Sequence, residues 1–125
     1  MTRGALAKPH FAARQMPTLW LGDCTSRNHD LGRLVRPQLL RAGTGVATNH
    51  RAASRGRSSK EFASRLGIVI EEADEAQFWF DVLIEFKYGP QEVALRLRRE
   101  AEELTAIFGA SRRTVLKRIN RRRAT

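Results

Sequence analysis

Four side chains of the sequence have the chemistry of metal ligands: His10, Cys24, His29 and His50. Zinc sites in proteins are built from two closely spaced pairs of such ligands, and these four residues do not form two such pairs. We therefore predict no metal site.

A cluster of carboxylates lies in the middle of the chain, at Glu71, Glu72, Asp74 and Glu75. A di-metal helical bundle would need Glu-x-x-His pairs on facing helices, and no histidine follows His50. We interpret the cluster as a solvated helix face or as the ion-pair partners of three arginines. These are Arg41, Arg51 and Arg55.

No combination of residues in the sequence is typical of catalysis. There is no P-loop and no Gly-x-Ser-x-Gly motif, and the Ser, His and Asp residues lack the local signature of a catalytic set. We predict that the protein is not an enzyme and that it binds no cofactor.

The formal net charge of +10 is the strongest compositional signal, and it is unevenly distributed. Residues 1–60 carry 11 Lys or Arg against 2 Asp or Glu, residues 61–110 carry 5 against 11, and residues 111–125 carry 7 against none. Two basic segments thus flank an acidic one. This pattern favours binding to RNA or another polyanion. The alternative is that the basic residues neutralise the acidic helix and keep the protein in solution.

If RNA is the partner, Lys and Arg near the ends of the helices would neutralise its phosphates. Few aromatic residues stand within the basic segments, so stacking of single-stranded bases is not expected. The three consecutive arginines at 121–123 are either a phosphate-contacting tail or a disordered end. The candidate residues are Arg41, Arg51, Arg55, Arg57, Arg112, Arg113, Lys117, Arg118, Arg121, Arg122 and Arg123.

The single cysteine excludes an intramolecular disulfide, which is typical of proteins in a reducing compartment. No run of about 18 apolar residues is present, and prolines and charges interrupt the N-terminal apolar patches. We predict a cytoplasmic protein without a membrane partner.

A long central helix over 59–88 is predicted to position these side chains. Ser58 and Glu61 have the spacing of a capping box, and apolar or small residues then recur in steps of three and four. Gly89 and Pro90 mark its end, because glycine adopts the left-handed conformation and proline starts a new helix. The apolar stripe consists of Phe62, Leu66, Val69, Ala73, Ala76, Phe80 and Leu83.

Similar spacing predicts helices over about 34–55 and 91–118, and the short connections favour antiparallel neighbours. Residues 1–32, broken by proline and glycine, are predicted to be irregular or to form a short first helix. The predicted fold is an all-α, antiparallel, up-down four-helix bundle over 33–119, with a degraded or short first helix and a frayed basic tail at 120–125.

Three consecutive aromatic residues, Phe78, Trp79 and Phe80, must point in different directions around a helix. At least one therefore lies outside the core of a single chain. We predict an oligomer interface at Phe78 and Trp79, since exposed aromatic residues mark protein contacts. The alternative is a wide bundle that covers all three.

The segment 104–119 resembles a helix-turn-helix motif, with Gly109 in the turn and Ser111 capping a basic second helix. It would make the protein a DNA-binding regulator. The motif requires a break at Gly109, whereas the apolar stripe continues in one helical phase through Val115. A purely structural protein-interaction module is a further alternative.

A second resemblance covers about 32–118. The sequence resembles the four-helix-bundle proteins encoded in intervening sequences of bacterial large-subunit (23S) ribosomal RNA genes, a family related to the accessory protein of diversity-generating retroelements. The motifs that carry it are QLLR at 38–41, NHRAA at 49–53, KEF at 60–62, GIVIEEADE at 67–75, FW at 78–79, EELTAIF at 102–108 and ASR at 110–112.

This resemblance implies an up-down bundle without a catalytic site that assembles into a homo-oligomeric ring, with a pentamer as one arrangement. It also implies association with RNA or with a protein partner in a ribonucleoprotein. The family has Tyr at the position of His50, and it has a long amphipathic first helix where this chain has 1–32. Either the first helix is short and kinked, or the reading frame or start of this copy is altered.

Overall fold

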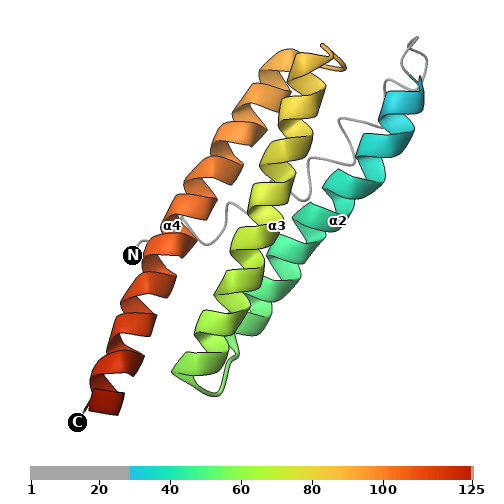
Figure 1. Ribbon diagram of the computed structural model, residues 1–125. Helices are drawn as coiled ribbons and strands as arrows, with labels where there is room; N and C mark the ends of the chain where they lie inside the picture. The colour runs from blue at the N-terminus through green and yellow to red at the C-terminus, as the bar shows by residue number, and fades with distance from the viewer. Residues whose placement is uncertain (1–28, 125) are drawn as a thin grey trace.

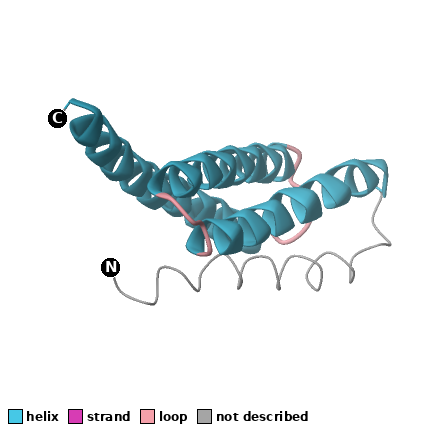
Figure 2. Cartoon of the chain, turned by 90° about the horizontal axis from the view of Figure 1, so that it is seen from below, coloured by secondary structure: helices cyan, strands magenta, loops and turns pink. Residues whose placement is uncertain are grey.

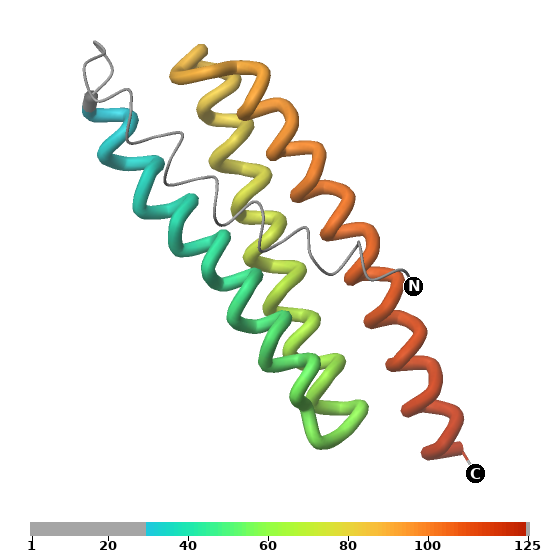
Figure 3. Tube along the Cα trace, turned by 180° about the vertical axis from the view of Figure 1, so that it is seen from behind, coloured from blue at the N-terminus to red at the C-terminus, as the bar shows by residue number. Residues whose placement is uncertain are grey.

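The computed structural model describes residues 29–124, which form three long α-helices joined by two short loops (Figures 1 and 2). The helix α3 lies between α2 and α4 and packs against both, as the view from behind also shows (Figure 3). Neighbouring helices run antiparallel, and no strand occurs within 29–124, so the all-α prediction holds for this part of the chain. The helices are α2 (His29–Ser54), α3 (Ser59–Glu85) and α4 (Gln91–Ala124).

The predicted irregular segment or first helix falls mostly outside the described residues, which begin at His29. The helix α2 starts there, five residues before the predicted start, and it includes Pro37 as an interior residue. Its first turns are held by tertiary contacts. Leu31 packs on the core, and Gly32 is buried against the ring of Tyr88, so closely that a Cβ atom would clash with the Tyr88 hydroxyl.

The start of α3 has the predicted cap of Ser58 and Glu61, except that the Glu61 carboxylate pairs with the amide of Arg57, one residue before the N-cap Ser58. The Ser58 hydroxyl accepts a hydrogen bond from the Glu61 amide at 3.1 Å, and the Glu61 carboxylate accepts one from the Arg57 amide at 3.0 Å. Amides that a helix start leaves without partners are thereby satisfied. The predicted apolar face is confirmed except at its first position, where Ala63 is buried and Phe62 is half-buried.

The core consists of two clusters along α3. One cluster, near the α3–α4 loop, is built around Phe80, Leu83 and Tyr88, and the other, near the α2–α3 loop, is built around Leu66 and Phe108. Six large side chains are almost completely buried and stabilise the fold by about 1.5–3 kcal/mol each. They are Phe80, Leu66, Leu83, Leu97, Val35 and Val69.

The end of α3 differs from the prediction. The helix ends at Glu85, and Lys87, with φ of 50°, adopts the left-handed conformation in addition to Gly89 at 72°. The Tyr88 amide donates to the Leu83 carbonyl at 2.9 Å, and the Lys87 amide donates to the Ile84 carbonyl at 3.1 Å. This is a Schellman motif with lysine where glycine is usual, and the burial of Tyr88 supplies its apolar contact.

The helix α4 is continuous through Gly109 to Ala124. A helix-turn-helix needs two helices at a steep angle, so the alternative of a helix-turn-helix regulator that uses 104–119 is wrong on this geometry. The helix also extends beyond its predicted end near residue 118 and includes the predicted basic tail as far as Ala124. No residue after Phe108 is buried within the described part of α4.

Candidate nucleic-acid interface

Positive charge gathers at one end of the three helices. The α2–α3 loop and the last turns of α4 lie at this end (Figure 1). Residues 51–65 carry five Lys or Arg against one Glu, and residues 109–124 carry seven against no Asp or Glu, which gives a net charge of +11. Residues 29–50 and 66–108 carry seven against eleven, a net charge of −4. We call residues 51–65 and 109–124 the basic end.

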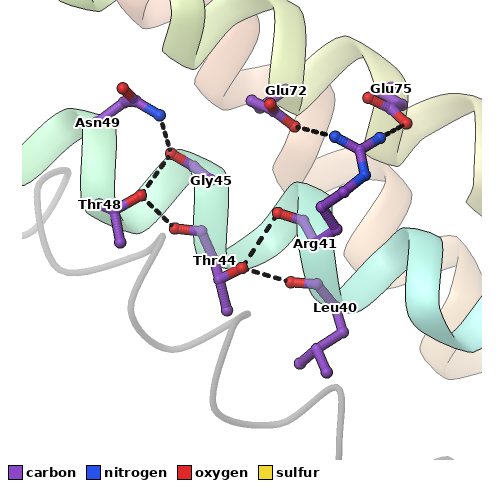
Figure 4. A network of polar contacts seen from close by, with 8 residues as sticks. All are labelled: Leu40, Arg41, Thr44, Gly45, Thr48, Asn49, Glu72 and Glu75. Atoms are coloured by element: carbon purple, nitrogen blue, oxygen red, sulfur yellow. Dashed lines mark hydrogen bonds and ion pairs between the residues drawn. The ribbon is translucent and has the colours of Figure 1, made fainter.

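Arg41 lies outside the basic end and contacts the acidic face of α3. Its guanidinium pairs with the Glu75 carboxylate and lies 3.7 Å from Glu72 Oε2 (Figure 4). The ion pairs predicted for the carboxylate cluster are thus confirmed for Arg41. Its charge is paired with carboxylates of α3, so Arg41 contributes to the contact of α2 with α3.

Glu72 is inserted between the two helices. A Cβ atom at Gly45 would lie 2.9 Å from Glu72 Cδ, so glycine gives this side chain its space. Burial raises the pKa of Glu72 above its ordinary value, and Arg41 opposes that shift. Its Oε2 atom is buried and has no hydrogen-bond partner among the described residues, so the ion pair with Arg41 only partly compensates the lost hydration.

Arg112, a predicted phosphate ligand, also makes a contact between helices. Its Nε donates to the Ala63 carbonyl at 3.1 Å, and the guanidinium lies over Gly67, where a Cβ atom would be 3.3 Å from Nε. The side chain is half-buried. Arg112 therefore ties α4 to α3, and the glycine in α3 makes room for it.

The other nine candidates are exposed and belong to the basic end. Sequence reasoning missed a tenth exposed cation, Lys60 in the first turn of α3, although it directly follows the predicted basic loop. Arg65 is half-buried and donates to the Asn49 side chain at 3.4 Å. The nine exposed candidates predicted from the sequence are Arg51, Arg55, Arg57, Arg113, Lys117, Arg118, Arg121, Arg122 and Arg123.

The three consecutive aromatic residues diverge as their spacing requires. Phe80 is 2% exposed, Trp79 is half-buried and Phe78 is 57% exposed. The rings of Phe78 and Trp79 meet edge to face, with centroids 5.0 Å apart. Phe78 continues at four-residue spacing to Val82 and to Phe86, which is 63% exposed, so the outward side of α3 also carries an apolar row.

Within 29–124, no three His, Cys, Asp or Glu side chains are grouped so that they could hold a metal ion. In the same part of the chain, every helix is too polar or too short in its apolar stretch to span a bilayer.

The fold has a match among solved structures. A protein of unknown function from the S23 ribosomal protein family of Bacteroides thetaiotaomicron superposes with a TM-score of 0.75 at 23% identity, over 87% of this chain and 95% of its own. No protein-family model and no curated protein matches the sequence. At this level of identity, the similarity shows a common fold.

Proposed function

We propose that this chain belongs to the S23 ribosomal protein family of its structural neighbour and to the intervening-sequence proteins that its sequence resembles, with their relation to retroelement accessory proteins. In this proposal the fold is the antiparallel four-helix bundle that the sequence predicts, with a degraded or short first helix ahead of the three described helices. The shared fold and the motifs along α2, α3 and α4 support it.

The proposed activity is non-enzymatic binding of structured RNA in a cytoplasmic ribonucleoprotein. The supporting observation is the basic end, where nine exposed predicted cations and Lys60 face solvent at a net charge of +11. Each phosphate that a Lys or Arg neutralises releases condensed counterions, so the affinity falls as salt rises. Because the cations project from helices and a short loop, they can follow a phosphate backbone without reading bases.

We also propose that the protein forms a homo-oligomeric ring through the outward side of α3. Phe78 and Phe86 place exposed apolar surface there, and the half-buried Trp79 and Val82, which pack on the core, lie beside them. A head-to-tail contact of this face with a different face of a second copy closes into a ring when the rotation between copies permits. Light scattering tests the ring, which predicts a discrete oligomer, whereas a monomer at all concentrations contradicts it.

The RNA proposal is tested with two triple variants that each remove three positive charges. One changes Arg113, Lys117 and Arg121 to Gln at the basic end, and its matched control changes Arg33, Lys87 and Arg99, which are exposed elsewhere. Binding to a structured RNA is measured between 50 and 200 mM salt, a range in which several phosphate contacts change the affinity by orders of magnitude. The basic-end variant is expected to lower the slope of log K against log salt by about 2–3.

The control variant is expected to retain the wild-type slope. Equal losses in both variants would mean that net charge alone attracts RNA, which contradicts a defined basic end. Absence of RNA binding by the wild-type protein would leave the purely structural interaction module as the better account.

A further inference from the structure

A hollow of about 550 Å³ opens between the α2–α3 loop and the last turns of α4. In both Figure 1 and Figure 3 the end of α4 stands apart from this loop. The separation follows from the sequence of α4, whose last buried residue is Phe108. The lining residues are Gly56, Arg57, Ser58, Ser59, Phe62, Val115 and Arg122.

The lining combines an apolar part with a cationic one. Phe62 from α3 and Val115 from α4 are half-buried, and Phe62 packs on the core cluster around Leu66. Arg57 and Arg122 approach from two segments far apart in the sequence, and both are exposed. The capping box fixes the loop side, because the Arg57 amide is held by the Glu61 carboxylate.

We propose that this hollow receives one unpaired nucleotide of an RNA, with its base against Phe62 and its flanking phosphates on Arg57 and Arg122. The inference rests on the proposed RNA binding and adds the kind of RNA that is preferred. Proteins recognise RNA mainly at bulges and loops, where unstacked bases lie on aromatic side chains. The volume falls within the range of about 300–1,000 Å³ that is usual for small-molecule sites.

Charge and shape together select this occupant. An apolar peptide segment would fit the Phe62 and Val115 part of the hollow but would bring no negative charge to the exposed guanidinium groups of Arg57 and Arg122. A regular RNA duplex would satisfy the guanidinium groups but would present no base face to Phe62. An extruded nucleotide offers both an aromatic face and phosphates, and the +11 charge of the basic end attracts the strand that carries it.

The test uses two RNA hairpins that differ by one unpaired 2-aminopurine nucleotide, present in a bulged hairpin and absent from its fully paired control. Affinities of the full-length protein are measured for both, together with the fluorescence of the 2-aminopurine, which falls when the base stacks on an aromatic ring. The wild-type protein is expected to bind the bulged hairpin about tenfold more tightly, as expected for one stacked base, with quenching.

Three variants locate the contact. Phe62→Leu keeps an apolar side chain on the core but removes the aromatic face, so the preference and the quenching are expected to disappear while both hairpins still bind. Arg122→Gln is expected to weaken binding of the bulged hairpin several-fold more than Arg123→Gln, which removes the same charge outside the hollow. Thermal unfolding of each variant checks that the fold is retained.

Equal affinity of the wild-type protein for both hairpins, with the usual salt dependence, would overturn this inference and leave the proposed function intact. A preference that survives Phe62→Leu would also overturn it. Failure to bind either hairpin at low salt would overturn both the inference and the proposed function.

Discussion

Replacing Arg112 with glutamine is expected to destabilise the protein, whereas the same change at Arg113 is not. Arg112 donates a charge-assisted hydrogen bond to the Ala63 carbonyl and covers Gly67, while Arg113 is exposed. Hydrogen bonds of charged groups contribute about 1.5–3 kcal/mol, and the half-exposure of Arg112 places its share near the lower limit, about 1.5 kcal/mol. An exposed substitution such as Arg113→Gln changes stability by less than about 0.5 kcal/mol.

The two variants have the same net charge, so any difference in stability between them reports the contact of α4 with α3. With an unfolding entropy of about 2.1 cal/mol/K per residue, a loss of 1.5 kcal/mol lowers the Tm of this chain by about 6 °C. Thermal unfolding followed by circular dichroism measures the shift at equal protein concentration. Equal Tm values for the two variants would refute the structural role of Arg112 and return it to the exposed cations of the basic end.

Three further substitutions test the loop, the start of α2 and the buried carboxylate. Lys87→Gly is expected to raise the free energy of unfolding by about 0.5–1 kcal/mol in urea titrations, because glycine removes the strain of the left-handed conformation; a loss of stability would contradict this. Gly32→Ala is expected to cost about 1–3 kcal/mol, and Tyr88→Phe, which removes the clashing hydroxyl, is expected to recover part of that in a double-mutant cycle. The pKa of Glu72 is higher in the folded than in the unfolded protein, so its contribution to stability falls as the pH rises from below its ordinary value of 4.5 through the raised folded-state pKa. Glu72→Gln is therefore expected to be at least as stable as the wild type at pH 7, and its stability relative to the wild type is expected to be higher at pH 7 than at pH 4. A relative stability that is lower at pH 7 than at pH 4 would contradict the sign of the shift.

The central helix could be predicted from the sequence because its signals are local. The capping box at Ser58 and Glu61 and the steps of three and four along α3 depend only on helix geometry, and the structure has both. The same reasoning predicted that Phe78 and Phe80 point in different directions, which their exposed fractions of 57% and 2% confirm.

Features that depend on contacts between helices could not be predicted in this way. The early start of α2 depends on the contact of Gly32 with Tyr88, residues 56 positions apart. The position of Lys87 depends on how the buried Tyr88 closes the loop. In each case a local signal, the polar segment before Leu34 or the glycine at Gly89, favoured a different boundary.

In the candidate interface, too, some features could be predicted from the sequence and others depend on contacts between helices. Clustering of basic residues in the two segments that flank the acidic one predicted most of the exposed cations, since Arg55, Arg57 and Arg121 need only be accessible. Nothing in the sequence distinguishes Arg112 from Arg113, because the carbonyl that separates their roles belongs to a helix 49 residues earlier. The sequence has few aromatic residues within its basic segments, and only folding brings Phe62 of α3 beside Val115 and Arg122 of α4.

Hydrogen–deuterium exchange of the full-length protein, with and without a structured RNA at low salt, tests the basic end most directly. Our account predicts that RNA slows exchange at residues 51–65 and 109–124. The acidic stretch 71–103 is expected to exchange at the same rate with and without RNA, provided that the oligomeric state is the same in both samples. Protection confined to 71–103, or no protection at the basic end under conditions where RNA is bound, would contradict it.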